Sequence, residues 1–229
     1  MDAVIHTKQG PKSLHVCKDG TIENTAWVAI YEEAFPAGQR QSLDDLMQQL
    51  RDGTMELDET RDEHDNILCM TITEVFRHPP VLPTFLLACY TAVVPDMRGL
   101  GIGSIHRTRL DSLLKNEYPD YVGIVSEIES TFEQGISAEA MDVRVKRKKF
   151  FMKLGLQPLA IDYFFPSYVA GEAPIPGELL WVPFTNEPLT KEQLSGMVTR
   201  IYTEGYQLPS DHPLISQVVS SIKEVSSIR

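Results

Sequence analysis

Residues 93–104 read VVPDMRGLGIGS, and this stretch decides the fold of the chain. An apolar strand runs into a turn with glycines at alternate positions, Gly99, Gly101 and Gly103, and a helix follows at once. Glycine permits backbone angles that are closed to other residues and leaves no Cβ in the way of a ligand. The first N–H groups of a helix lack partners inside it, and the helix dipole favours an anion there. With the positive charge of Arg98 beside it, the segment predicts a phosphate-binding turn.

Two other phosphate-binding turns do not fit this stretch. The dinucleotide fingerprint requires G-x-G-x-x-G, a spacing that Gly99, Gly101 and Gly103 do not have. The nucleoside-triphosphate loop requires Gly-Lys-Ser or Gly-Lys-Thr, which the sequence lacks. A glycine-rich turn before a helix is also common as a plain tight connection. A second motif is therefore needed to assign a ligand.

Hydrophobic periodicity and turn residues predict the elements around the turn. We expect strands over 14–18, 54–57, 67–75, 84–94, 122–128, 159–165 and 179–184, and helices capped by Asn24 or Thr25, by Ser42 and by Asp142, with another over 101–117. The run from Asp58 to Asn66 is nearly all charged or polar, which predicts a solvated turn. Strands that alternate with helices after Val94 indicate a mixed sheet with right-handed crossovers.

The second motif lies at residues 149–156, which read KFFMKLGL, an aromatic pair on a helix that ends at Leu-Gly. With Arg98-x-x-Gly101-x-Gly103, it resembles the GNAT superfamily of acyl-CoA N-acyltransferases. That family carries Arg/Gln-x-x-Gly-x-Gly/Ala after a strand that ends near a proline. The order of elements over residues 14–184 also agrees. The resemblance implies an α/β (α+β) fold with a mixed, mostly antiparallel central sheet flanked by helices.

The chain is expected to divide at residue 185. Residues 1–185 would form the acyltransferase domain, and residues 186–229 would form a C-terminal helical extension packed on it. Two apolar stripes predict the helices of this extension, one at Leu194, Met197, Val198 and Ile201 and one at Leu214, Ile215, Val218, Val219 and Ile222. Two alternatives stay open for them: they form the interface of a homodimer, or they cover the domain's own core.

The resemblance implies acetyl-CoA as the acyl donor and a reaction that needs no metal. Backbone groups of Ala92, Val93 and Val94 would bind the pantetheine arm. The pyrophosphate would lie against Arg98 and against the backbone of Gly99, Leu100, Gly101, Ile102, Gly103 and Ser104. Phe151, from the aromatic pair, belongs to the same cofactor site. A neutral amine would then attack the thioester directly.

The sequence departs from the family at Phe151, where a tyrosine usually supplies the proton for the leaving thiolate. Tyr163 on the next strand is our candidate for that role. Glu127 and Glu129 share one face of an otherwise apolar strand, where burying a carboxylate costs free energy unless the group is used or paired. We take both as candidate bases for the ammonium proton. The alternative is that they face solvent or pair with basic residues of the helix at 143–153.

Two histidines and one basic cluster each allow a structural interpretation as well as a functional one. His106, in the helix after the turn, is expected to be a satisfied histidine rather than a catalyst. His64 lies among acidic residues. A metal site is one interpretation of this cluster, but we expect a charged turn instead. The basic residues between Arg144 and Lys149 predict a solvated helix face, some of which could meet coenzyme A phosphates.

Composition limits the class of protein. The formal net charge of -11 comes from 21 Lys and Arg against 32 Asp and Glu, which disfavours nucleic-acid binding and tolerates a cationic amine. Cys17, Cys69 and Cys89 are isolated, and no signal peptide or membrane-spanning stretch is evident, so we expect a cytoplasmic protein without membrane association. The expected acceptor is a primary amine of a small molecule or peptide. A non-catalytic acyl-CoA-binding or regulatory module is the alternative.

Overall fold

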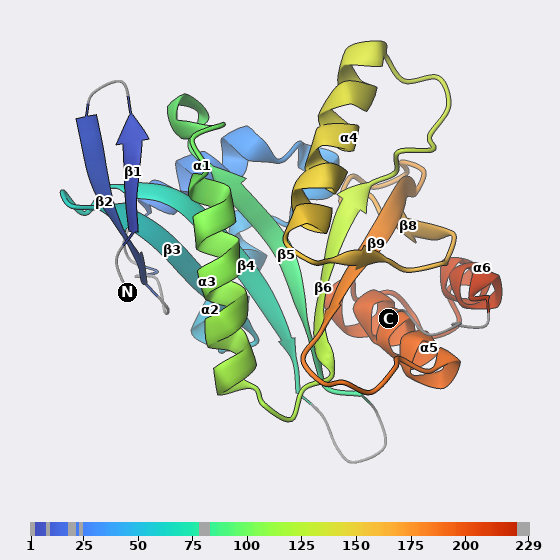
Figure 1. Ribbon diagram of the computed structural model, residues 1–229. Helices are drawn as coiled ribbons and strands as arrows, with labels where there is room; N and C mark the ends of the chain where they lie inside the picture. The colour runs from blue at the N-terminus through green and yellow to red at the C-terminus, as the bar shows by residue number, and fades with distance from the viewer. Residues whose placement is uncertain (1–2, 8–9, 18–21, 23–24, 78–82, 224–229) are drawn as a thin grey trace. The chain divides into compact units, whose positions relative to one another are not determined.

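The computed structural model describes residues 3–7, 10–17, 22, 25–77 and 83–223. Their strands form a mixed, mostly antiparallel sheet flanked by helices (Figure 1), which confirms the predicted fold class. The chain divides into two compact units. The first comprises Met1–Val75 and Ala88–Tyr118, and the second comprises Phe76–Leu87 and Pro119–Arg229.

The first unit is built on neighbouring strands that follow the chain in order. The strands are β1 (Ala3–Thr7), β2 (Gly10–Cys17), β3 (Met55–Asp62), β4 (Ile67–Phe76) and β5 (Phe85–Val93), of which Phe76 and Phe85–Leu87 belong to the second unit. The pairs β1–β2, β2–β3 and β3–β4 are antiparallel. The strand expected over 14–18 therefore begins earlier, and β1 was not predicted; residue 18 lies outside the described residues.

Helices of the first unit begin where their capping residues predict. These helices are α1 (Ala26–Ala34), α2 (Leu43–Arg51) and α3 (Ile102–Glu117), with 3₁₀ turns η1 (Ala37–Gln39) and η2 (Pro95–Met97). Thr25 is the N-cap of α1, and the Ser42 side chain accepts from the Asp45 N–H at the start of α2. Trp27 and Tyr31 of α1 are fully buried in a core with Met70 of β4. The apolar faces read from the sequence thus pack onto the sheet.

The polar run from Asp58 to Asn66 is not a solvated turn, so this prediction was wrong. Strand β3 continues to Asp62, and Asp58, Glu59 and Thr60 are fully buried within it. Glu59 accepts a hydrogen bond from Arg61 Nε at 2.9 Å. Polar groups enter a sheet at acceptable cost when neighbours satisfy them, and the sequence pattern does not reveal such partners.

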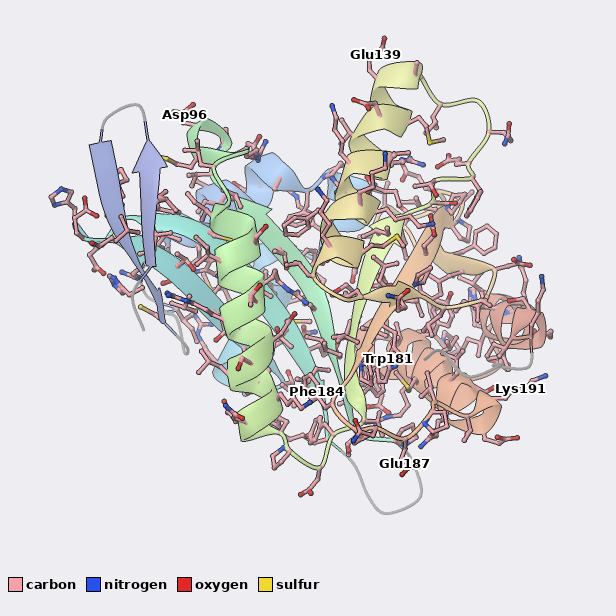
Figure 2. The ribbon with its side chains drawn as sticks, viewed as in Figure 1. Asp96, Glu139, Trp181, Phe184, Glu187 and Lys191 are labelled. Atoms are coloured by element: carbon pink, nitrogen blue, oxygen red, sulfur yellow. The ribbon has the colours of Figure 1, made fainter. Side chains whose placement is uncertain are left out.

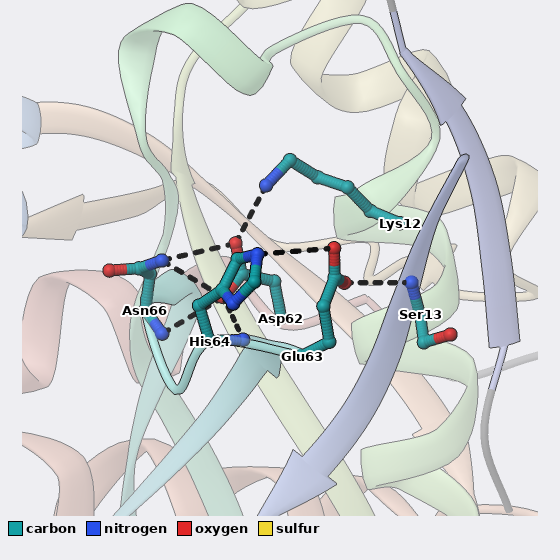
Figure 3. A network of polar contacts seen from close by, with 6 residues as sticks. All are labelled: Lys12, Ser13, Asp62, Glu63, His64 and Asn66. Atoms are coloured by element: carbon teal, nitrogen blue, oxygen red, sulfur yellow. Dashed lines mark hydrogen bonds and ion pairs between the residues drawn. The ribbon is translucent and has the colours of Figure 1, made fainter. Parts of the chain in front are cut away.

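The turn itself is confined to the residues after Asp62, whose carboxylate organises it (Figure 3). Lys12 Nζ lies 2.7 Å from Asp62 Oδ2, and the N–H groups of His64 and Asn66 each donate to Oδ1 at 3.0 Å. Glu63 accepts from the Ser13 N–H at 3.0 Å. His64 is part of a charged turn that ties β3 to β2, as its structural reading predicts.

The second unit is built around β9 (Ile175–Pro183), which pairs antiparallel with three strands. These are β6 (Gly123–Glu129), β7 (Gln157–Pro158) and β8 (Tyr163–Phe165). The start of β5 also belongs here, and the Val122 N–H donates to Thr84 O at 2.9 Å. A Cβ added to Gly123 would lie 2.5 Å from the ring of Trp181, which Figure 2 labels on β9, so glycine is required at this crossing.

Helix α4 (Ala138–Lys153) begins earlier than the sequence predicts. Ser137, not Asp142, is its N-cap, and the Ser137 side chain accepts from the Ala140 N–H at 3.2 Å. Asp142 lies inside the helix and pairs with Lys146 at 2.5 Å, one turn further on. Serine and aspartate both cap helices, so the prediction of Asp142 as the cap was wrong although the residue type was suitable.

The two C-terminal helices are confirmed as α5 (Lys191–Arg200) and α6 (Pro213–Ser221). A capping box of Thr190 and Gln193 begins α5, and a π-helical turn, η3 (Ile201–Gly205), follows it. The division of the chain at residue 185 stays a prediction. Within the described ranges, no helix combines the length and the apolar character needed to cross a bilayer.

Candidate functional site

The predicted phosphate-binding turn opens α3 in the first unit. After η2, which contains Asp96 (Figure 2), the chain takes left-handed backbone angles at Gly99 (φ +80°) and Gly101 (φ +84°). Glycine adopts these angles at little cost, whereas other residues are strained there. A Cβ built at either position would meet no atom within 4 Å. The glycines therefore serve the backbone bend and leave open space beside it.

The main-chain donors at the start of α3 have no partner inside the helix. The first helical hydrogen bond runs from the Ile105 N–H to Gly101 O at 3.1 Å. The N–H groups of Ile102, Gly103 and Ser104 lie before it and therefore have no acceptor within the helix. Gly101 is the N-cap and offers no side chain to satisfy them. The first turn also carries no acidic residue that would repel an anion. Donors and helix dipole together suit a phosphate group at this end.

The end of β5, expected to contact pantetheine, already makes main-chain hydrogen bonds within the first unit. The Val94 N–H donates to Leu68 O at 3.0 Å, and Val93 O accepts from Arg98 Nε at 3.0 Å. Ala92 is buried in the core. These bonds hold the strand end rigid next to the turn.

Arg98 does not extend freely beside the turn. Its two terminal nitrogens donate to the Glu33 carboxylate at the end of α1, with 3.2 Å between Nη1 and Oε1. Both side chains remain about half exposed, at 48% and 44%. An exposed ion pair of this kind contributes about 0–1 kcal/mol, so a diphosphate could replace the carboxylate. No local feature of the sequence pointed to Glu33, 65 residues before Arg98, as this partner.

His106, about one turn into α3, is a satisfied core histidine. It is fully buried, and Nδ1 and Nε2 lie 2.8 Å from the hydroxyls of Thr60 and Thr71 respectively. Burial is the main reason that its pKa is lowered to about 3, and the neighbouring Arg107 acts in the same direction. The ring is therefore neutral and anchors α3 to β3 and β4.

In the second unit, the Glu127 carboxylate on β6 accepts hydrogen bonds from two phenols. Tyr163 on β8 donates to Oε1, and Tyr206 Oη lies 3.0 Å from Oε1 and 3.2 Å from Oε2. Burial raises the pKa of Glu127 to about 7, against the opposite effect of the two hydrogen bonds. A carboxyl group that titrates near neutral pH is suited to accept a proton during a reaction.

Glu129, the other candidate base, is paired and lies outside this cluster. Its carboxylate forms an ion pair with Arg147 of α4, which is the pairing with a basic residue of that helix that the structural alternative describes. Other basic residues of α4 are matched in the same way. Lys148 pairs with Glu178 on β9, and Arg144 pairs with Glu133 in the preceding loop.

Phe151 is an apolar core residue, 7% exposed, packed with Ile128, Leu156 and Leu180. Its ring contacts that of Phe150 edge-on, with the centroids 5.1 Å apart. No proton donor is present at this position.

Tyr163 is buried, and burial raises its pKa well above the ordinary value, so the phenol stays protonated and can donate.

Sequence reasoning missed Tyr206 and the aromatic group that it completes. The Tyr163 and Tyr202 rings are stacked with centroids 5.6 Å apart, and the Tyr206 ring lies 6.2 Å from Tyr202 and 5.5 Å from Tyr168. The available signal was the four-residue spacing of Tyr202 and Tyr206, which places both on one helix face. The structure thus brings Glu127 and Tyr163 together and adds Tyr206.

Comparisons with known proteins identify the fold. No protein-family model and no curated protein matches the sequence. Among solved structures, a Bacteroides thetaiotaomicron protein assigned to the GNAT family of acetyltransferases matches with a TM-score of 0.66 at 19% identity, covering 86% of this chain and 99% of that chain.

Two further structures are similar at lower identity. Arabidopsis thaliana NAA60 in complex with acetyl-CoA has a TM-score of 0.54 and 10% identity, covering 74% of this chain and 98% of that chain. An Escherichia coli N-acetyltransferase for an alanine of a ribosomal protein has a TM-score of 0.51 and 15% identity, covering 76% and 96%. The chain therefore has the fold of the GNAT superfamily of N-acyltransferases.

Proposed function

We propose that the chain is a cytoplasmic N-acetyltransferase, which transfers the acetyl group of acetyl-CoA to a primary amine of a small molecule or peptide. The observation that carries this proposal is the uncapped N-terminus of α3 behind two left-handed glycines. Such a terminus offers main-chain donors and a positive dipole end to a diphosphate. The acetyl-CoA complex of a protein with the same fold, NAA60, supports the choice of cofactor.

In this proposal, the cofactor is held mainly by backbone groups. The N–H groups of residues 99–104 bind the pyrophosphate, and Arg98 joins them by exchanging Glu33 for a phosphate. The backbone of residues 92–94 binds the pantetheine arm, and Arg98 releases Val93 O when it turns to the phosphate. Backbone recognition needs no particular side chains, which agrees with the low sequence identity to proteins of this fold.

Glu127 is the proposed base and Tyr163 the proposed acid. The amine nitrogen attacks the thioester carbonyl carbon, and its proton passes to the Glu127 carboxylate. The carbon–sulfur bond then breaks, and the Tyr163 phenol donates its proton to the leaving thiolate. Glu127, now protonated and hydrogen-bonded to Tyr163, returns a proton to the phenolate. We assign the base role to Glu127 because Arg147 already pairs with Glu129.

Phe151 favours a second candidate, a non-catalytic module that binds acyl-CoA. The residue is buried among apolar side chains, so it cannot supply the proton that a tyrosine would donate there. Under this alternative, the chain binds acetyl-CoA and does not release its thiol.

The deciding experiment measures free thiol released from acetyl-CoA in the presence of a panel of primary amines, including polyamines, aryl-alkyl amines and peptides with a free N-terminus. We expect release with at least one amine class, at least a hundredfold less with Glu127→Gln, and near-normal release with Glu129→Gln. Binding of acetyl-CoA without release for any amine would favour the module. Equal activity of Glu127→Gln and the unchanged protein would exclude Glu127 as base.

A further inference from the structure

Tyr206 belongs to the C-terminal segment after α5, yet its hydroxyl reaches the carboxylate on β6. The hydroxyl donates to one oxygen of Glu127 and lies within hydrogen-bond distance of both. Both residues lie in the second unit, where the β6–β9 pairing also fixes the position of Glu127 opposite Leu179. This contact links the segment after residue 186 directly to the proposed base.

An irregular turn places Tyr206 at this position. Residues 201–205 form a π-helical turn, closed by the Tyr206 N–H donating to Ile201 O at 2.9 Å. π-turns are rare and occur frequently at functional sites. The backbone irregularity and the phenol–carboxylate contact are separate observations, and they meet at the same residue.

The segment before Tyr206 is anchored on both sides. Arg200 is 3% exposed, donates to Pro83 O at 2.9 Å and to Glu204 Oε1 at 2.7 Å, and lies over the ring of Phe85. Tyr202 donates its hydroxyl to Phe164 O in β8. An anchored turn can hold a side chain in one orientation, which is what a positioning residue requires.

We propose that Tyr206 is a positioning residue for Glu127, so that the C-terminal segment completes the acetyl-transfer site. The phenol holds the carboxylate in the orientation in which it accepts the amine proton. This inference rests on the proposed function, and it assigns the segment after residue 186 a part in the site itself.

The ionisable groups around Glu127 make this role measurable. They are phenols from two elements, Tyr163 on β8 and Tyr202 and Tyr206 in and after η3. Burial raises the pKa of both Tyr163 and Tyr202, so these phenols stay neutral. Removing the Tyr206 hydroxyl takes one donor from the ionised form of Glu127 and therefore raises the pKa of Glu127 further.

The test compares Tyr206→Phe with Tyr202→Phe in the full chain. The control loses a hydroxyl from the same aromatic group, one that donates to Phe164 O and reaches Glu127 only through Tyr163. Carbon-13 NMR of labelled glutamate carboxyls, assigned with Glu127→Gln, gives the pKa of Glu127 in each protein without requiring activity. The acidic limb of the kcat/KM profile is measured alongside.

We expect Tyr206→Phe to raise the pKa of Glu127 by about 0.5–1 unit and to move the acidic limb upward equally, while Tyr202→Phe changes both by clearly less. An unchanged Glu127 pKa in Tyr206→Phe, or an equal shift in the control, would overturn the role of Tyr206. Absence of thiol release from the unaltered chain would instead count against acetyl transfer itself, so the two failures are distinguishable.

Discussion

Arg98 and Glu33 form an ion pair, in which the Glu33 carboxylate accepts hydrogen bonds from the Arg98 guanidinium next to the glycine turn. The cation predicted to meet a phosphate is thus already matched by a carboxylate from the end of α1. Because the pair is exposed and weak, it is a competitor for the ligand rather than a block. Coenzyme A binding should therefore depend on the charge at residue 33.

Glu33→Gln should bind acetyl-CoA about two- to fivefold more tightly than the unaltered chain. The change frees the guanidinium from a pair that contributes about 0–1 kcal/mol and removes a negative charge beside the anion. Isothermal titration calorimetry at low salt measures the effect. Glu32→Gln is the matched control, since Glu32 lies one residue away and pairs with Arg40 instead. Weaker binding by Glu33→Gln, or the same gain in both variants, would contradict this prediction.

Gly101→Ala should lose acetyl-CoA affinity at least tenfold and lower the free energy of unfolding by about 1 kcal/mol. The strain arises because alanine adopts φ +84° poorly, and the lost affinity arises because a methyl group enters the open space beside the donors. Gly53→Ala is a matched control, with φ +69° and equally open surroundings at the end of α2. Urea unfolding and calorimetry of both variants should show similar destabilisation and a loss of binding in Gly101→Ala alone.

Glu127→Gln should make the protein more stable at pH 8 while removing activity. The folded-state pKa of about 7 lies above the ordinary 4.5, so the stability that the protonated carboxyl contributes is complete below pH 4.5 and is lost as pH rises to 7. The difference between the two pKa values corresponds to up to about 3 kcal/mol. The free energy of unfolding of Glu127→Gln, relative to the unaltered chain, should be higher by this amount at pH 8 than at pH 4.5. Urea unfolding at both pH values measures it. An identical stability difference at the two pH values would show that Glu127 is not perturbed.

Asp62 should give the opposite dependence on pH. Burial alone would raise its pKa, but hydrogen bonds from Lys12, Asn66 and the His64 N–H outweigh it and lower the pKa to about 2 from 3.8. The ionised carboxylate therefore contributes stability that is complete above pH 4 and is lost as pH falls towards 2. Asp62→Asn should be less stable than the unaltered chain at pH 6, and the difference should shrink by pH 2.5. A constant difference in urea unfolding would contradict this assignment.

Local features of the sequence predicted the parts of the fold that depend on local chemistry. Ser42 and Thr25 marked helix starts, and the three alternating glycines marked the bend before α3, because capping and backbone angles are set by neighbouring residues. The same reasoning was wrong for β3, because it predicted a solvated turn from residues 58–66. Asp62 is buried because Lys12, which is 50 residues away, satisfies it, and Glu59 is buried because Arg61 of the same strand donates to it.

The candidate site shows the same division. Glu127 and Glu129 read alike in sequence, two carboxylates on one face of one strand. Only the tertiary structure separates them, since Arg147 lies near one and the phenols of Tyr163 and Tyr206 lie near the other. Tyr206 is 79 residues from Glu127, and no local pattern links them.

The most direct test of the proposal is calorimetric titration of acetyl-CoA into the unaltered chain and into Gly103→Glu, which places a carboxylate among the main-chain donors of α3. We expect one molecule of acetyl-CoA to bind the unaltered chain, raising its unfolding temperature as a ligand of the folded state must, and no binding to the folded variant. Equal binding to both proteins, or no binding to the unaltered chain at a large excess of acetyl-CoA, would contradict it.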